Sequence, residues 1–130
     1  MRAVAIDHVV LRVVDLTRAT RFYEDVLGCR IERDRPELGM TQLRVGTALI
    51  DLIAIDGRLG RQGGARPGEE GRNMDHLCLR IADFEVDRVV AELEGAGAEV
   101  NATDRRYGST GEAISVYAKD PDGNGLELRA

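Results

Sequence analysis

The chain has little of what several classes of protein require. Tryptophan is absent, and aromatic residues make up 4% of the 130 residues, so a stacking platform for nucleic-acid bases is not expected. The formal net charge of -5 argues against binding to a phosphate backbone, because nucleic-acid-binding proteins usually present a basic face. We therefore expect no nucleic-acid partner.

Long apolar runs and cysteine motifs are missing as well. No segment approaches the roughly 20 apolar residues of a membrane-spanning helix, and the first residues lack the apolar core and cleavage site of a signal peptide. The cysteines, Cys29 and Cys78, do not have the spacing of a metal motif, and two free thiols are typical of a reducing compartment. These features predict a cytoplasmic protein that makes no membrane contact.

Only two histidines are present, and they lie in two similar segments. Residues 6–16, "IDHVVLRVVDL", align with residues 74–84, "MDHLCLRIADF", so that His8 matches His76. Each segment is followed by an amphipathic helix pattern and then by three further strand patterns. The sequence therefore predicts a duplicated unit with the order β-α-β-β-β.

Capping residues mark the expected ends of the two helices. The first helix has Asp15 or Thr17 as its N-cap and Gly28 at its C-terminal end. The second has Asp83 as its N-cap and Gly95 at its end. Ser, Thr and Asp accept hydrogen bonds from the first free N–H groups of a helix, and glycine adopts the left-handed conformation that ends one.

The repeat predicts an α+β protein in which residues 1–130 form a single domain. Module one spans residues 4–55 and module two spans residues 74–130. The connector between them, residues 56–73, is rich in glycine and arginine. Such a segment is either a solvated linker or a loop that covers a site.

Strand alternation places both histidines opposite the apolar face of their strands. His8 shares its side with Arg12, and His76 shares its side with Arg80, while the apolar residues between them face the helix. The same alternation places Asp51 and Glu127 opposite apolar neighbours. A sheet face of this kind is either exposed to water or the lining of a polar cavity. Two imidazoles and one or two carboxylates on adjacent strands are suitable ligands for a divalent first-row metal.

Three segments resemble one family. "IDHVVLRVVDLTRATRFYEDVLGCRI", "MDHLCLRI" and "DPDGNGLEL" are similar to the vicinal oxygen chelate superfamily, which includes glyoxalase I, extradiol dioxygenases, and fosfomycin- and bleomycin-resistance proteins. The likeness is greatest to small glyoxalase-domain proteins. It implies paired βαβββ modules that form a cupped mixed sheet with the helices on its outer face. It also implies a substrate that chelates a metal through two neighbouring oxygens.

The resemblance implies a set of metal ligands. The ligand positions of the superfamily fall on His8, Asp51, His76 and Glu127, and the cofactor is one divalent ion of nickel, zinc, cobalt, iron or manganese. Asp51 stands where glyoxalase I enzymes have the longer glutamate. It is therefore expected to be a fourth ligand, to act through a water molecule, or to support another ligand.

The resemblance also implies an activity. We expect a glyoxalase-type lyase or isomerase that transfers a proton on a small metal-chelating molecule such as a thiol adduct, with Glu127 as the base. Arg12 matches an arginine that contacts the glutathione carboxylate in glyoxalase I. Tyr117 lies on the side of its strand that faces the expected cavity. The expected assembly is a homodimer.

Two alternatives stay open at the level of sequence. One is an extradiol-dioxygenase-like oxidoreductase, which also uses two histidines and a glutamate, although both histidines here are needed as ligands and none remains for the further histidine that those enzymes use. The other is a binding or resistance protein that sequesters a small molecule without chemistry.

Overall fold

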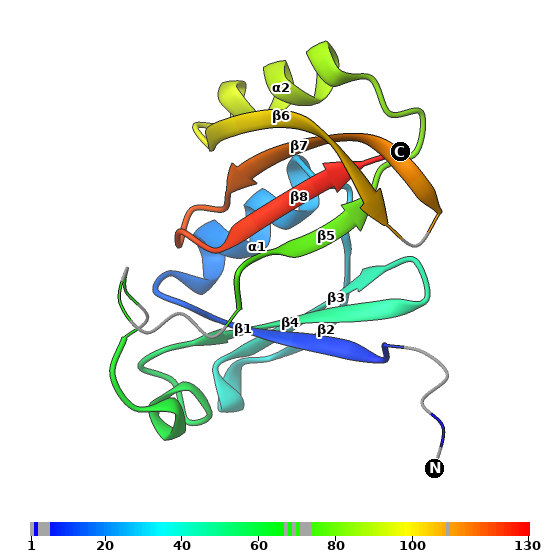
Figure 1. Cartoon of the computed structure of the whole chain (residues 1–130). Helices are drawn as coiled ribbons and strands as arrows, with labels where there is room; N and C mark the ends of the chain where they lie inside the picture. The colour runs from blue at the N-terminus through cyan, green and yellow to red at the C-terminus, as the bar shows by residue number, and fades with distance from the viewer. Residues whose placement is uncertain (1, 3–5, 67, 69, 71–73, 109) are drawn as a thin grey trace. The chain divides into compact units, whose positions relative to one another are not determined.

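The chain folds into two compact units, Met1–Glu70 and Gly71–Ala130, and their boundary lies within the predicted connector (Figure 1). The computed structural model describes residues 2, 6–66, 68, 70, 74–108 and 110–130. Each unit contains one four-stranded mixed sheet and one α-helix. The predicted α+β class and the β-α-β-β-β order of both modules are confirmed.

Unit 1 begins with a strand and a helix, as the sequence predicts. Its elements are β1 (His8–Val13), α1 (Leu16–Asp25), β2 (Arg30–Arg35), the short 3-10 helix η1 (Pro36–Leu38), β3 (Met40–Val45) and β4 (Ala48–Ala54). The strand order is β1-β4-β3-β2. Strand β1 is parallel to β4, and the other pairs are antiparallel.

Unit 2 has the same topology. Its elements are β5 (Leu77–Arg80), α2 (Val86–Gly95), β6 (Glu99–Gly108), β7 (Gly111–Lys119) and β8 (Gly125–Arg129). The strand order is β5-β8-β7-β6, and only the β5–β8 pair is parallel. The sequence repeat is therefore a repeat of topology and of pairing.

Each helix covers one face of its own sheet. Helix α1 contacts β3 and β4, and helix α2 contacts β6 and β7. Ala19, Phe22 and Tyr23 of α1 are buried, as are Val89 and Leu93 of α2. The apolar residues of β1 and β5 that were predicted to face the helix include the buried Leu11, Val13 and Leu79. The predicted polar residues therefore lie on the other face of each sheet.

The first helix begins and ends as predicted. Asp15 is the N-cap, and its carboxylate accepts the N–H of Arg18 at 2.9 Å. Gly28 follows the helix with a φ of 67°, a left-handed conformation in which glycine has no Cβ to clash. Of the two candidate caps, Asp15 and not Thr17 satisfies a free backbone donor.

The second helix ends at Gly95 as predicted, but its predicted N-cap is wrong. The N-cap residue of α2 is Glu85, and no side chain caps this end. Asp83 instead adopts a left-handed backbone with a φ of 50°, and its carbonyl oxygen accepts a hydrogen bond from Arg88. At the other end Gly95 is the last helical residue, and the left-handed glycine is Gly97, with a φ of 74°.

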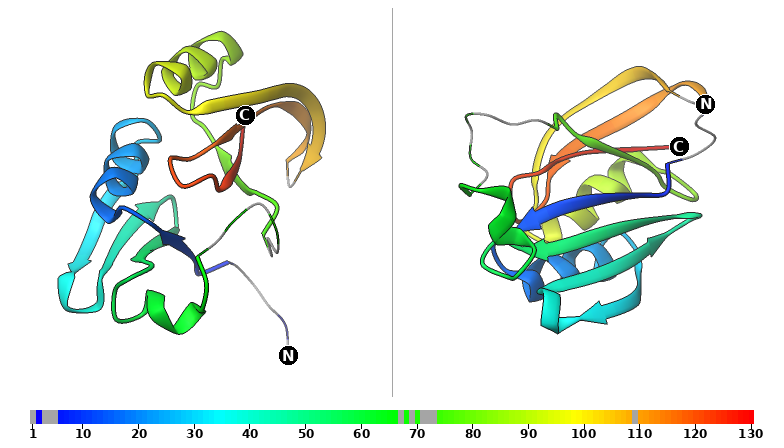
Figure 2. Two further views of the ribbon diagram at one scale, coloured as in Figure 1. Left: turned by 90° about the vertical axis from the view of Figure 1, so that its left-hand side faces the viewer. Right: turned by 90° about the horizontal axis from the view of Figure 1, so that it is seen from below.

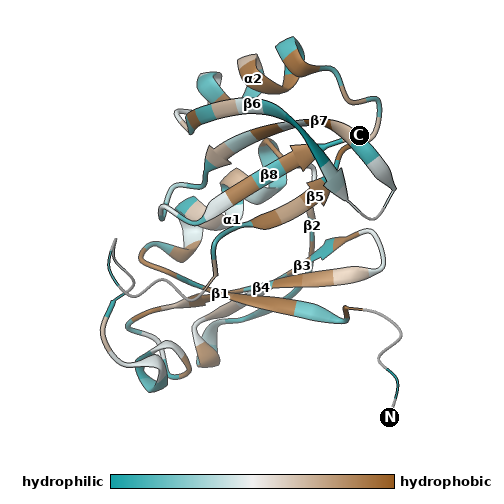
Figure 3. Cartoon of the chain, in the orientation of Figure 1, coloured by the Kyte–Doolittle hydropathy of each residue, from teal (hydrophilic) through white to brown (hydrophobic). Residues whose placement is uncertain are grey.

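The β6–β7 hairpin is longer than the sequence pattern predicts. The glycines and serine of "GSTGE", residues 108–112, predict a loop. Strand β6 instead continues to Gly108 and β7 starts at Gly111, and residue 109 lies outside the described residues. Pairing between β7 and β8 stops at Ser115, so the hairpin extends beyond β8 (Figure 2). The polar distal part of β6 has no apolar alternation (Figure 3), which explains why its length was missed.

The turn between β7 and β8 is formed by "DPDGN", residues 120–124, which consists of residue types that favour turns. Asp120 accepts the backbone N–H groups of Asp122 and Asn124 at 2.9 and 2.8 Å. This turn places Gly125 at the start of β8, and so sets the register of Glu127.

Within the described residues, no helix has the length and apolar character that crossing a membrane requires.

Candidate metal and proton-transfer site

In unit 2 the predicted residues His76 and Glu127 contact each other. His76 directly precedes β5, and Glu127 lies in the middle of β8. The distance from His76 Nε2 to Glu127 Oε2 is 3.0 Å, and the distance from His76 Nδ1 to Asp75 Oδ2 is 2.7 Å. The ring of Tyr117, on β7, stands perpendicular to the imidazole with 5.7 Å between ring centroids. Three of the predicted site residues are thus side by side.

Glu127 is held in place from a neighbouring strand. It is 6% exposed, and the Ser115 hydroxyl donates to its Oε1 at 2.5 Å. Burial alone would raise the pKa of Glu127. Hydrogen bonds from Ser115 and Tyr117, followed by the nearby charges of His76 and Arg129, outweigh burial and lower that pKa. The carboxylate is therefore ionised at neutral pH and able to accept a proton or a metal.

The two contacts of His76 place a condition on its ring. Both nitrogens lie within hydrogen-bond distance of a carboxylate oxygen. A neutral imidazole has one N–H, so it donates to only one of these oxygens. The second nitrogen and its carboxylate oxygen are then both acceptors, and they attract each other only with a further proton or a metal cation between them.

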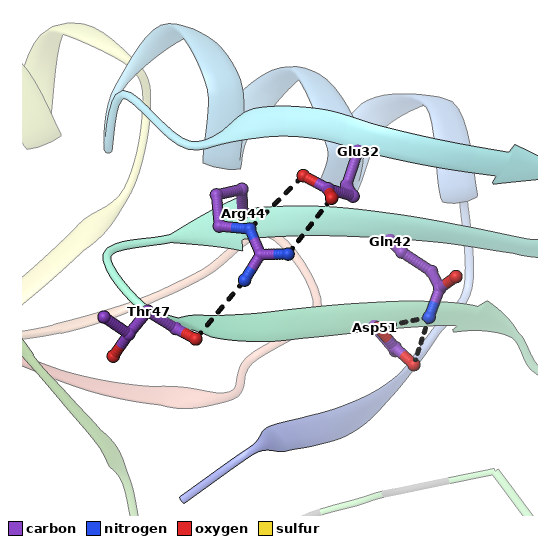
Figure 4. A network of polar contacts seen from close by, with 5 residues as sticks. All are labelled: Glu32, Gln42, Arg44, Thr47 and Asp51. Atoms are coloured by element: carbon purple, nitrogen blue, oxygen red, sulfur yellow. Dashed lines mark hydrogen bonds and ion pairs between the residues drawn. The ribbon is translucent and has the colours of Figure 1, made fainter.

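In unit 1 His8 and Asp51 occupy the corresponding strands, but no direct contact joins them. The distance from His8 Nδ1 to Asp7 Oδ1 is 2.8 Å. The hydrogen bond with Asp7 raises the pKa of His8 against the effect of burial, and the charge of Asp51 raises it further. Asp51 is 6% exposed, and both of its carboxylate oxygens accept from Gln42 Nε2, at 3.1 and 3.0 Å (Figure 4).

The register of the two sheets makes Asp51 and Glu127 equivalent. Asp51 pairs with Val10, two residues after His8. Glu127 pairs with Cys78, two residues after His76. On the antiparallel neighbouring strand, Gln42 pairs with Asp51 and Tyr117 pairs with Glu127. The same backbone arrangement therefore presents an aspartate in one unit and a glutamate in the other.

Arg12 is engaged with the connector. Its guanidinium donates to the carbonyl oxygens of Gly63, Gly64 and Ala65 at 3.0, 2.8 and 3.1 Å. These residues lie at and just after the end of the short 3-10 helix η2 (Gly60–Gly63). A Cβ on Gly63 would come within 2.7 Å of the guanidinium, so glycine allows this close approach. The interaction fixes part of the connector against β1.

The four predicted ligands fall into two pairs, one in each unit. Within the described residues, no group of three or more His, Cys, Asp and Glu side chains has the arrangement of a metal site. The donor set nevertheless fits a divalent cation, because each histidine has its Nδ1 beside an aspartate and its Nε2 directed elsewhere. A partner of this kind on one ring nitrogen orients the other for metal binding.

Comparison with known proteins identifies the family of the chain. Residues 5–128 match the model of the Glyoxalase/Bleomycin resistance protein/Dioxygenase superfamily. The chain belongs to this superfamily. The superfamily match spans both units, so both histidines and both carboxylates lie within it.

Three relatives in the superfamily are similar along most of their length. Virulence protein STM3117 of Salmonella typhimurium is 34% identical over 95% of this chain and 81% of its own. Its crystal structure superposes with a TM-score of 0.74, covering 99% of this chain and 98% of that chain at 31% identity. A lactoylglutathione lyase of Haemophilus influenzae is 30% identical over 93% of this chain and 88% of its own. The human mitochondrial methylmalonyl-CoA epimerase is 25% identical over 95% of this chain and 72% of its own.

Four contributors to the site were not predicted from the sequence as site residues. Asp7 and Asp75 contact the two histidines, and Gln42 and Ser115 bind the two carboxylates. The aspartates precede each histidine in both copies of the repeat, so the repeat itself was the signal. Gln42 and Ser115 become visible only when the strand register is known.

Proposed function

We propose that the chain is a metal-dependent lyase or isomerase that moves a proton on a small molecule, with Glu127 as the base. The observation that carries this proposal is the 3.0 Å approach of His76 Nε2 to the buried, hydrogen-bonded carboxylate of Glu127. A base must be ionised at working pH and must be held in one orientation. The lowered pKa of Glu127 and its bond from Ser115 meet both requirements.

The proposed ligands are His8, His76 and Glu127, with Asp51 as a fourth ligand or as a partner of a bound water. The bound ion, which is nickel, zinc, cobalt, iron or manganese, would polarise the substrate oxygens that chelate it. Within the chain, Glu127 accepts a proton from the carbon beside those oxygens and returns it to the product. Tyr117 stands beside both His76 and Glu127, where it would orient the substrate.

The relatives support proton transfer as the common chemistry. One is named a lactoylglutathione lyase and another a methylmalonyl-CoA epimerase. Both reactions need a carboxylate or similar base beside an acidic C–H, and Glu127 supplies one. The proposed role of Arg12 in binding a substrate carboxylate requires its three carbonyl contacts with the connector to open.

The test measures substrate turnover by the protein after its metal has been removed and replaced. Metal is removed with EDTA, and each of the five divalent ions is returned in turn. The hemithioacetal of methylglyoxal and glutathione, and methylmalonyl-CoA in D₂O, are then offered as substrates. We expect thioester formation or deuterium incorporation that depends on the metal and is lost in Glu127→Gln. Absence of both reactions with every metal would contradict the proposal.

The same experiment separates the alternatives. Activity that requires Fe(II) and consumes oxygen would instead support a dioxygenase-like oxidoreductase. Tight binding of a small molecule with metal-independent affinity and no turnover would support a binding or resistance protein.

A homodimer is part of the proposal, as is a location in the cytoplasm. Light scattering during size-exclusion chromatography is expected to give twice the 14.2 kDa of one chain. A mass equal to one chain at all concentrations would contradict this assembly.

A further inference from the structure

Two arginines of unit 2 lie next to each other beside Glu127. Arg80, the last residue of β5, is paired in register with Arg129 of β8. Residues paired in this way point to the same face of a sheet, with neighbouring strands about 4.8 Å apart. Glu127 is two residues before Arg129 on the same strand, and so it shares that face. Two cations therefore adjoin the carboxylate of the proposed site.

Arg129 is buried, and no close ion pair joins it to a carboxylate of the described residues. It is 3% exposed, and its Nη2 donates to the carbonyl oxygens of Gly111 and Arg106 at 2.6 and 3.5 Å. Its Nε is buried and donates to no acceptor within the described part of the chain. Carbonyl oxygens satisfy hydrogen bonds but do not neutralise a cation, and a buried charge without a counter-ion is costly.

Arg80 differs from its repeat equivalent in unit 1. That equivalent is Arg12, whose guanidinium binds three carbonyl oxygens. Arg80 is exposed, and no hydrogen bond or ion pair links its side chain to another described residue. In unit 1 the residue that pairs with Arg12 on the neighbouring strand is Ile53. The equivalent residue in unit 2 is Arg129. The module therefore folds without a second arginine at this position.

One carboxylate, Glu127, shares this face with the two arginines, so it balances only one of their charges. Arg106, which lies on β6, forms an ion pair with Asp104 at 2.6 Å, so Asp104 already has a partner. Glu127 is bound by Ser115 and contacts His76. Like charges placed directly opposite each other on a sheet destabilise it, which makes an anionic ligand the natural partner of the two arginines.

We infer that Arg80 and Arg129 form a subsite for a carboxylate or phosphate group. Guanidinium groups present paired N–H donors that match the oxygens of both anions. The inference rests on the proposed function and specifies its substrate class, a small acid whose anionic group lies near the reacting carbon. Two residues along a strand span about 7 Å, which separates the backbone positions of Glu127 and Arg129 on β8.

The test is anion binding by the metal-free protein, which removes any contribution from a bound cation. Inorganic phosphate and acetate are titrated separately while the arginine Nε–H signals are followed by NMR. We expect saturable binding in the parent chain. We expect roughly tenfold weaker binding in Arg80→Gln, as the loss of one charge-assisted hydrogen bond implies. Arg105→Gln is the matched control, since Arg105 pairs with Ile114 on the other face of the hairpin, and it should bind as the parent does.

Arg129→Lys keeps the buried charge and protects the fold, but it removes the planar fork. We expect this variant to bind both anions more weakly than the parent chain does. Its amide spectrum reports whether the fold is intact. Stronger binding of phosphate than of acetate would identify a phosphorylated substrate, and the reverse order a carboxylic acid. The inference is overturned if the parent chain shows no saturable binding, or if Arg80→Gln binds as tightly as the parent.

These outcomes are distinct from a failure of the proposed function. Glu127→Gln should lose turnover while retaining anion binding in the metal-free state. If the chain binds phosphate but turns over no substrate, the subsite is supported and the proposed function is contradicted. If the chain turns over a substrate but binds neither anion, only the subsite is contradicted.

Discussion

The two units have the same topology and register, yet only unit 2 brings its histidine and carboxylate into contact. Asp51 and Glu127 occupy equivalent positions on β4 and β8. The glutamate has one more methylene, and its Oε2 is 3.0 Å from His76 Nε2. The aspartate is instead held by Gln42. The backbone arrangement stays the same, while the length of the carboxylate side chain and the residue paired with it, Gln42 or Tyr117, both differ.

The arginines of the two units differ in the same manner. Arg12 and Arg80 are repeat equivalents, and Arg12 binds the carbonyl oxygens of residues 63–65. Unit 2 has no corresponding loop at this position among its described residues, and Arg80 is exposed. The duplicated scaffold thus uses the same residue type for loop anchoring in one unit and leaves it accessible in the other.

The largest expected difference between the units is in catalysis. Glu127→Gln should lower kcat by about 10²- to 10⁴-fold, because it removes the base. Asp51→Asn should have a much smaller effect, since Gln42 and not a histidine is its neighbour. Steady-state kinetics on the metal-loaded variants measure both. Equal losses in the two variants would show that the carboxylates have the same role.

The aspartates beside the histidines should affect metal affinity. Asp75→Asn is expected to weaken metal binding by about 10- to 100-fold, because it removes the partner that orients the His76 ring. Asp7→Asn tests the same role for His8. Competition with a chromogenic chelator measures the affinity. An unchanged affinity in both variants would remove these aspartates from the site.

Removing the contacts between Arg12 and the connector is expected to have a smaller effect. Arg12→Gln removes the charge-assisted hydrogen bonds to residues 63–65, so trypsin should cleave after Arg61 several-fold faster. Arg80→Gln is the control, because its side chain binds no described part of the connector. Cleavage at the parent rate in Arg12→Gln would contradict the anchoring role.

The smallest effect is the dependence of stability on pH. The folded state lowers the pKa of Glu127 below its ordinary value of 4.5. The stability that Glu127 contributes is therefore complete above pH 4.5 and is lost as the pH falls through its folded pKa. In EDTA, urea unfolding of the parent chain and Glu127→Gln should differ most near neutral pH and converge in acid. A difference that grows on acidification would contradict the lowered pKa.

Alternation and repetition made much of the site predictable from the sequence. The faces of the two histidines and two carboxylates follow from a period of two. The register agrees with this, because Asp51 pairs with Val10 and Glu127 pairs with Cys78, each two residues after a histidine. The repeat also predicted the topology of both units. These features depend on local periodicity, which the sequence contains directly.

Other features depend on contacts between distant segments. Whether Asp51 reaches His8 or Gln42 depends on side-chain length at a fixed register. The register shift between Val100 and Ala102 sets which β6 residues face Ser115 and Tyr117. The left-handed backbone of Asp83 moved the start of α2 by two residues from the predicted cap. None of these has a periodic signature in the sequence.

The proposal to be tested most directly is that His8 and His76 are both ligands of the bound metal ion. X-ray absorption spectroscopy on the zinc-loaded chain counts the imidazole ligands directly. We expect two imidazoles per zinc in the parent chain, with oxygen ligands completing about four-coordinate geometry, and one imidazole in His76→Ala. A spectrum with one imidazole or none in the parent chain, or one that His76→Ala leaves unchanged, would contradict it.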